Sequence, residues 1–249
     1  NRFYADARLP RAERAELEDY KRSGYSRGHM APAGDMPSAQ AMAQSFSLAN
    51  MVPQAPKNNQ QVWRELEEAT RALAVKQKQD VYVVTGPVFA AKKLKTIGKG
   101  VIVPTAVFKA LYLPKTGAAG AYYAPNDNSQ QVKIVSICYL EEQLGINLFP
   151  QLSEEQKRNT YHLPLKATAV KAGKPVEYSN WDAESQCAED VSSSQLQAMQ
   201  KQFSAAGGAS SAAAPAQGGS ASGIDADAQN AIVKQLIESL LQYILQLLK

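Results

Sequence analysis

Cysteine and histidine are scarce in this chain of 249 residues, and their scarcity limits the metal chemistry open to it. The two cysteines, Cys138 and Cys187, form no CxxC pair and have no histidine at ligand spacing, which argues against a structural zinc site. They either form one disulfide in an oxidising compartment or remain two reduced thiols. With only two histidines present, a catalytic histidine is either His29 or His162.

Long apolar runs and a recognisable leader are also missing. The sequence contains no stretch of about eighteen or more apolar residues, so it predicts no transmembrane segment. No signal peptide is visible at the start, and the first residue is Asn1 rather than Met, so we expect that an upstream segment has been removed or left out. The formal net charge of +4 fits a polyanionic partner and equally fits an ordinary solvated surface.

Hydrophobic periodicity predicts one α+β domain over residues 1–190, with a mixed or antiparallel central sheet flanked by helices. Apolar residues recur every three or four positions in residues 60–78, which indicates an amphipathic helix. A β-branched run at 81–85 ends at Gly86-Pro87, as a buried strand before a turn does. Further expected elements are a helix within 11–20, extended segments at 101–113 and 132–139, and a short helix at 141–145.

The last sixty residues have a different composition. Residues 191–223 are expected to form a flexible linker rich in Ala, Gly and Ser, because such a composition cannot bury a core. Residues 224–249 are expected to form a separate amphipathic helix, because their apolar side chains repeat in a short heptad pattern. Three partners are open for this helix: another copy of the chain through residues 225–249, the chain's own domain, or a membrane surface.

Two motifs carry the functional information. The first is Ser26-Arg27-Gly28-His29, and the second places Asn50, Asn59 and Glu67 in an Asn–x8–Asn–x7–Glu pattern. Together they resemble the signature of the DNA/RNA non-specific endonucleases, a ββα-metal family related to endonuclease G. Further similar pieces are VYVVTGPVF at 81–89 and LGINLFP at 144–150, and the resemblance covers roughly residues 1–165. The resemblance implies a ββα-metal element over roughly residues 25–78.

The same resemblance implies a role for each motif residue in a metal-dependent, sugar-non-specific endonuclease. His29 matches the general base that activates water, a task suited to a side chain whose pKa lies near neutral pH. Arg27 matches an arginine whose planar fork fits phosphate oxygens. Asn50 matches an asparagine that supports the active-site geometry and the phosphate.

The resemblance also implies the cofactor and the partners. Asn59 matches the single protein ligand of Mg²⁺, for which Mn²⁺ can substitute, and Glu67 matches the acidic residue that holds the metal's waters. Eight residues separate the two, which is about two helical turns, so we expect both on one helix face. The expected substrates are DNA and RNA. Because so unselective a nuclease endangers its host, we expect an inhibitor protein, or a secreted, periplasmic or otherwise compartmentalised location.

Ser26 departs from the family motif, which has Asp at this position. The alternative function is therefore a weakened or inactive nucleic-acid-binding or assembly protein on the same fold. Ser26 also creates a literal G-x-S-x-G pattern, Gly24 to Gly28, which is the nucleophile elbow of serine hydrolases. The polar segment before it is unlike the buried strand that an elbow requires, so we favour the nuclease.

Overall fold

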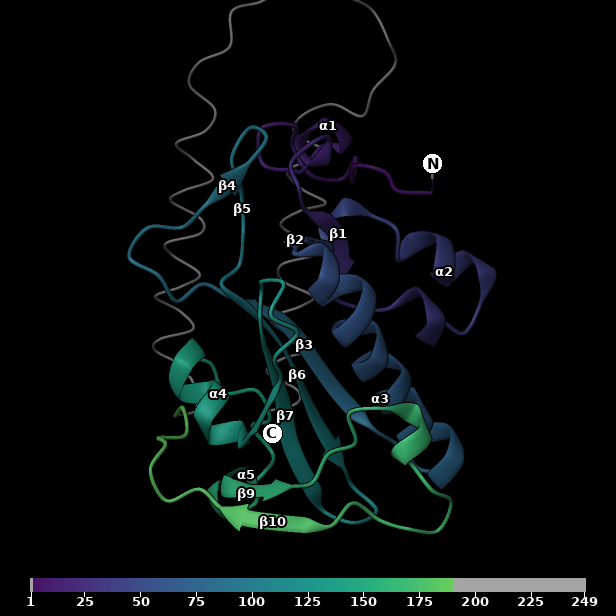
Figure 1. Ribbon diagram of the computed structural model, residues 1–249, viewed down its shortest axis with the longest axis vertical. Helices are drawn as coiled ribbons and strands as arrows, with labels where there is room; N and C mark the ends of the chain where they lie inside the picture. The colour runs from purple at the N-terminus through teal and green to yellow at the C-terminus, as the bar shows by residue number, and fades with distance from the viewer. Residues whose placement is uncertain (1, 190–249) are drawn as a thin grey trace, which may run out of the picture. The chain divides into compact units, whose positions relative to one another are not determined.

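A four-stranded antiparallel sheet organises residues 2–189, the part of the chain that the computed structural model describes (Figure 1). The strand order is β3-β6-β7-β8, so β6 lies between two long neighbours. In register, Val83 faces Leu111 on one side of β6, and Gly120 faces Leu111 on the other. The strands are β3 (Tyr82–Val88), β6 (Ala106–Leu113), β7 (Ala118–Pro125) and β8 (Lys133–Val135).

Both faces of the sheet are covered by helices. Helix α3 (Arg64–Gln77) lies along one face, where Leu66 and Leu73 pack against Leu111. On the other face, Ile137 and Leu140 of α4 (Ile137–Leu144) belong to a second buried cluster that includes alternate residues of β6 and β7. Side chains alternate between the two sides of a strand, so β6 contributes to both clusters and is buried on both faces.

A separate antiparallel hairpin precedes α3. Strand β1 (Ser26–His29) pairs with β2 (Met51–Gln54), and the chain then enters a helix that begins with a π-helical segment, Asn58–Trp63, before α3. This strand–strand–helix order is the predicted ββα element. The π-helical segment was not predicted, because apolar spacing alone does not distinguish hydrogen bonds to residue i+4 from bonds to residue i+5.

The remaining elements are short. In chain order they are α1 (Leu17–Tyr20), η1 (Ala33–Asp35), α2 (Ala39–Gln44), η2 (Leu48–Asn50), β4 (Thr96–Ile97), β5 (Val101–Ile102), α5 (Glu154–Arg158), β9 (Asn159–Tyr161), η4 (Ala167–Ala169) and β10 (Tyr178–Trp181). Strand β4 pairs with β5, and β9 pairs with β10. In Figure 1, α1, β4 and β5 lie above the sheet, and β9 and β10 lie at its lower end.

Three expectations about elements were wrong. The helix expected within residues 11–20 is limited to α1, because Glu16 is extended and forms a capping box with Asp19 that starts the helix there. The strand expected to run through 139 ends at Val135, because the Ser136 hydroxyl caps α4. Strand β7 was missed because its alanines and glycine have low strand propensity, although burial between two layers favours such small side chains.

Covalent and terminal features complete the fold. Cys138 and Cys187 form a disulfide, which settles the alternative left open by the sequence. It joins α4 to the segment that ends the described range. Within that range, no helix is long and apolar enough to cross a membrane. The expected linker at 191–223 and helix at 224–249 lie outside the described residues.

Candidate active site

In the β1–β2 hairpin, the side chains of the first motif point alternately to its two faces. Arg27 and His29 are two residues apart on a strand, so their side chains point to the same face, while Ser26 and Gly28 point to the other. On that other face Gly28 packs on the buried side chain of Gln54, where any Cβ would overlap Oε1 of Gln54. A glycine is therefore required between Arg27 and His29 by the close approach of β2.

Two aromatic rings hold His29. The imidazole lies 5.0 Å from the ring of Phe46 in an edge-on arrangement and 5.8 Å from the ring of Phe3. Its Nε2 atom is buried and has no hydrogen-bond partner within the described residues. Burial lowers the pKa of His29 from its ordinary value of 6.5, so the ring is neutral at neutral pH and able to accept a proton.

The N-terminal segment brings these aromatic rings together. The backbone of Tyr4 bonds to Phe46 and Leu48, with distances of 3.3 Å from Tyr4 N to Phe46 O and 2.8 Å from Leu48 N to Tyr4 O. Asp6 is buried beneath, where it accepts a hydrogen bond from the Ser47 hydroxyl at 3.1 Å. Hydrogen bonds from Arg8 hold the pKa of Asp6 far below its usual range, so this carboxylate stays charged.

Arg27 contacts a ring that also contacts His29, and Asn50 bonds to the loop that follows the histidine strand. The Arg27 guanidinium carbon lies 4.4 Å from the centroid of Phe3, the ring that also contacts His29. Asn50 uses its side chain on the loop that follows β1, where Oδ1 accepts from Ala31 N at 2.9 Å and Nδ2 donates to Ala31 O and Ser45 O. Two of these bonds hold Ala31, two residues after His29, and the third holds Ser45, so both polar atoms of the Asn50 amide bond to the chain's own backbone.

The two adjacent asparagines at the start of the helix have different environments. Asn58 is fully buried, where its amide accepts from Gln54 Nε2 and donates to Pro125 O at 3.0 Å. Asn59 is half-buried, and no hydrogen bond of its side chain occurs within the described residues. Asn58 is therefore structural, whereas the amide oxygen of Asn59 remains available for a ligand.

The π-helical segment affects how Asn59 relates to Glu67. In a regular α-helix, eight residues exceed two turns of 3.6 by almost one residue. A π-helix has more residues per turn, so its presence between the two positions brings eight residues closer to two full turns. Asn59 and Glu67 are thus better aligned on one face than a regular α-helix would align them.

The electrostatics of Glu67 fit a neighbouring cation. Burial raises the pKa of Glu67 to about 7, while the charge of Lys109 acts in the opposite direction. A poorly solvated carboxylate gains from a divalent ion and its waters, and an amide oxygen such as that of Asn59 is a ligand that Mg²⁺ accepts. No group of three or more His, Cys, Asp or Glu able to hold a metal occurs in residues 2–189.

A supporting residue that sequence reasoning missed is Asn126, directly after β7. Its Oδ1 accepts from Ala55 N at 2.8 Å, and its Nδ2 donates to Pro53 O at 2.9 Å and Pro104 O at 2.8 Å. The hairpin is thereby fastened to the main sheet at the entrance to the helix. No sequence pattern indicated this role, because an Asn after a strand usually indicates only a turn.

A cavity of about 830 Å³ lies beside the site, between α3 and the edge strand β3. Asn50 and Met30 line the end nearest the histidine strand, and Lys109 lines the cavity from β6. Also on its wall is an ion pair in which Arg71 Nε lies 2.6 Å from Asp35 Oδ1. The sequence analysis did not identify Arg71 as a residue near the site, although it lies four residues after Glu67 and so one turn along the same helix.

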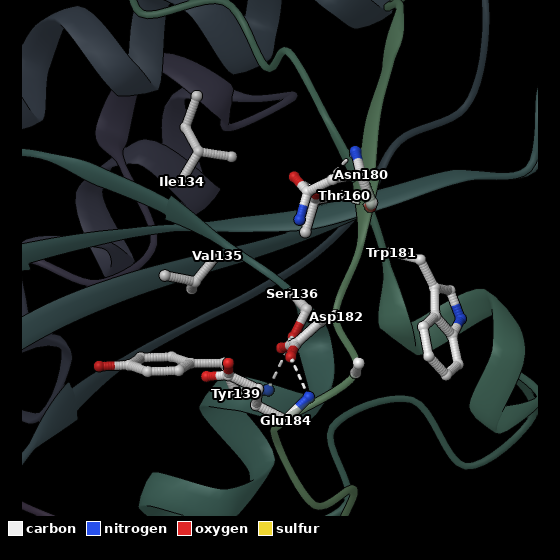
Figure 2. Close-up of a pocket in the computed structure, with 10 residues that line it drawn as sticks. Ile134, Val135, Ser136, Tyr139, Thr160, Asn180, Trp181, Asp182 and Glu184 are labelled. Carbon is white, nitrogen blue, oxygen red and sulfur yellow. Dashed lines mark hydrogen bonds between the residues drawn. The ribbon is translucent and has the colours of Figure 1, made fainter.

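A second hollow, of about 410 Å³, lies between β8, the start of α4 and β10, and it contains no predicted site residue (Figure 2). Its polar groups bond to one another: Ser136 Oγ donates to Asp182 Oδ2 at 2.5 Å, and Thr160 Oγ1 lies 2.6 Å from Asn180 Oδ1. The groups are already satisfied, so this hollow offers no converging set for chemistry.

The geometry of Ser26 is also unlike that of a hydrolase nucleophile. A nucleophile elbow lies at a sharp turn from a strand into a helix. Ser26 instead begins β1, and the residues that follow it continue the strand. The G-x-S-x-G match therefore lacks the structural context that would give it meaning.

A hairpin that presents a neutral histidine, followed by a helix that presents an amide and a carboxylate, defines the class of ββα-metal nucleases. Comparison with known proteins agrees: the model of the DNA/RNA non-specific endonuclease family matches residues 1–155, and the chain belongs to this family.

Individual relatives are similar over most of the described range. The mitochondrial nuclease EXOG of Danio rerio is 39% identical over 176 residues, covering 62% of this chain and 51% of the relative. Nuclease C1 of Cunninghamella echinulata is 35% identical, covering 61% and 68%. A crystal structure of the EndoG/EndoGI complex matches with a TM-score of 0.53 and 30% identity, covering 60% of this chain and 69% of the solved one. The chain thus spans about half the length of the EXOG relatives.

Proposed function

We propose that this chain is a Mg²⁺-dependent endonuclease that hydrolyses phosphodiester bonds in both DNA and RNA. The observation that carries the proposal is the buried, partnerless Nε2 of His29 beside Arg27, within the ββα element that also presents Asn59 and Glu67. Contacts to phosphates and a metal, rather than to base edges, explain a lack of sequence preference.

His29 acts as the general base in this proposal. Its neutral imidazole takes a proton from the attacking water, and the two aromatic rings keep it oriented and partly shielded from solvent. Arg27 binds a phosphate oxygen through its guanidinium while its flat face rests on Phe3. Asn50 holds the chain beyond the histidine and so preserves the direction of the ring.

Asn59 and Glu67 are the residues that would hold the metal. The amide oxygen of Asn59 would serve as the direct ligand, and the Glu67 carboxylate would accept hydrogen bonds from waters on the metal. When bound, Mg²⁺ (or Mn²⁺) supplies neutralisation of the charge on the phosphate and on the leaving oxygen.

The departure from the family motif at Ser26 is expected to affect activity little. Ser26 points to the face of β1 opposite His29, whereas the contacts that orient His29 come from Phe3 and Phe46. The inactive-binder alternative therefore lacks a structural observation in its favour. Restoring the family residue with Ser26→Asp tests this directly, and we expect little change in cleavage rate.

We further propose that the activity is confined by an oxidising or membrane-bounded compartment and restrained by a protein inhibitor. The Cys138–Cys187 disulfide supports an oxidising environment. Several relatives are named as mitochondrial, and the solved relative is described in complex with EndoGI in a study of its inhibition.

The deciding experiment is cleavage of supercoiled plasmid and of single-stranded RNA in Mg²⁺, in Mn²⁺ and in EDTA. His29→Ala is the test variant, and His162→Ala is the matched control because His162 is exposed and remote from the motif. We expect both substrates to be degraded with either metal, and cleavage to be abolished by EDTA and by His29→Ala alone. Unaltered protein that cleaves neither substrate with either metal would contradict the proposal.

A further inference from the structure

Lys109 is a buried cation in the middle of the central sheet. Only 1% of the residue is exposed, although lysine is rarely buried without a compensating charge. Its Nζ donates to Thr85 Oγ1 at 2.9 Å and lies 5.4 Å from the ring centroid of Trp63. A hydroxyl and a ring face do not neutralise a full charge, and no ion pair to Lys109 occurs within residues 2–189.

The helix above Lys109 places Glu67 opposite it. Trp63, which contacts the ammonium, lies four residues before Glu67. Thr70 and Arg71, three and four residues after Glu67, line the same cavity as Lys109. Residues at these spacings share one face of a helix, so Glu67 lies at the centre of the face that looks onto Lys109. In agreement, Glu67 raises the pKa of Lys109 against the larger lowering effect of burial.

The other cation in the cavity is already paired. Arg71 Nε lies 2.6 Å from Asp35 Oδ1, so its charge is largely compensated. Lys109, by contrast, has no ion pair within residues 2–189, and Glu67 is the carboxylate that raises the pKa of Lys109 most. In a poorly solvated space such an attraction acts over several ångströms.

We propose that Lys109 is a positioning residue for metal binding, whose fixed charge beneath α3 orients the Glu67 carboxylate toward the hydration shell of the divalent ion at Asn59. The inference rests on the proposed function. Lys109 acts through Glu67: a carboxylate already held in one orientation loses less conformational freedom when it binds the waters of the ion.

The test is Mn²⁺ binding to the full chain without substrate, followed by electron paramagnetic resonance, for the unaltered protein and for Lys109→Met, Glu67→Gln and the double variant. Methionine has a similar length and lacks the charge. We expect Lys109→Met to weaken Mn²⁺ binding about tenfold, the lower end for partners outside the ligand sphere. We expect no further loss when it is added to Glu67→Gln, because it acts through that residue.

Two further variants separate positioning from folding. Lys157→Met removes another buried lysine, which pairs with Glu141 at 3.0 Å far from the motif, and it is expected to lower stability to urea without changing Mn²⁺ binding. Thr85→Val keeps the Lys109 charge and removes its acceptor, so a smaller weakening in the same direction is expected. This variant tests the inference even where Lys109→Met does not fold.

The outcomes distinguish the inference from the function beneath it. Unchanged or tighter Mn²⁺ binding in both Lys109→Met and Thr85→Val, with weakened binding in Glu67→Gln, would overturn the positioning role and leave the nuclease proposal intact. Full additivity in the double variant would also overturn it. A rise in KM for DNA alone, with unchanged Mn²⁺ binding, would make Lys109 a substrate contact. Absence of Mn²⁺ binding by the unaltered chain would overturn the proposed function and this inference with it.

Discussion

Gly28→Ala is the substitution for which the structure gives the sharpest expectation. The added methyl group would lie 2.7 Å from Cβ and 2.9 Å from Cδ of Gln54, besides overlapping Oε1. The Cβ of Gln54 belongs to a buried residue on the paired strand, and the side chain is tied to Asn58, so rotation of a flexible end does not relieve the contact. Reaching an ordinary contact of 3.4 Å requires the strands to separate by about 0.7 Å.

This displacement should lower both the stability of the protein and its cleavage rate. Overpacking of this kind costs about 1–3 kcal/mol in the free energy of unfolding. His29 is the next residue, and misplacing a catalytic group by nearly 1 Å lowers the rate roughly tenfold to a hundredfold. Gly120→Ala is the matched control, because its nearest neighbour is the flexible end of Leu163 at 3.3 Å.

The assays are urea unfolding at equilibrium and plasmid cleavage under conditions where each variant is fully folded. We expect Gly28→Ala to lose both stability and rate, and Gly120→Ala to lose little of either. Stability and activity in Gly28→Ala equal to those of Gly120→Ala would refute the reasoning that Gln54 dictates glycine at this position.

Three further predictions follow from the site. Burial lowers the pKa of His29, and the proposed base is active only when neutral. The cleavage rate should therefore rise with pH along an acid limb whose midpoint lies below 6.5. A midpoint at or above that value in the pH–rate profile of the free enzyme would contradict the burial argument. Asn59→Ala should weaken Mn²⁺ binding without changing stability to urea. Asn58→Ala should lower the free energy of unfolding by about 1–3 kcal/mol, because it leaves the buried groups that bond to Asn58 without a partner. Reducing the Cys138–Cys187 disulfide should lower stability by roughly 4 kcal/mol, measured by urea unfolding with and without reductant, since the bond closes a loop spanning 49 residues.

The ββα element was predicted through the resemblance of its motif residues to the endonuclease family, and the structure gives a physical reason for their pattern. Gly28 stands where only a glycine fits, and the spacing from His29 to Asn59 and Glu67 reflects a hairpin followed by a helix. Helix α3 was predictable from its apolar spacing alone. Its π-helical beginning was not, because apolar spacing does not distinguish a π-helical turn from an α-helical one.

The residues that support the site are harder to read from the sequence. Asn126 and Lys109 lie on β7's end and on β6, far in sequence from the motif, and only the pairing of the sheet brings them to the hairpin and helix. Strand β7 itself was missed, since its small residues are favoured by the layers on either side rather than by strand propensity. Tertiary contacts of this kind leave no local pattern.

The two faces of the hairpin have different roles, and this difference explains why few side chains fit at each position. One face carries Arg27 and His29, the residues proposed to act on the substrate, while the other packs Gly28 on Gln54. Gln54 in turn bonds to Asn58, the neighbour of the metal-binding candidate Asn59. The base and the metal ligand are therefore linked through a short buried path rather than through solvent. A substitution on the packed face is expected to change the distance between base and metal even though it touches neither.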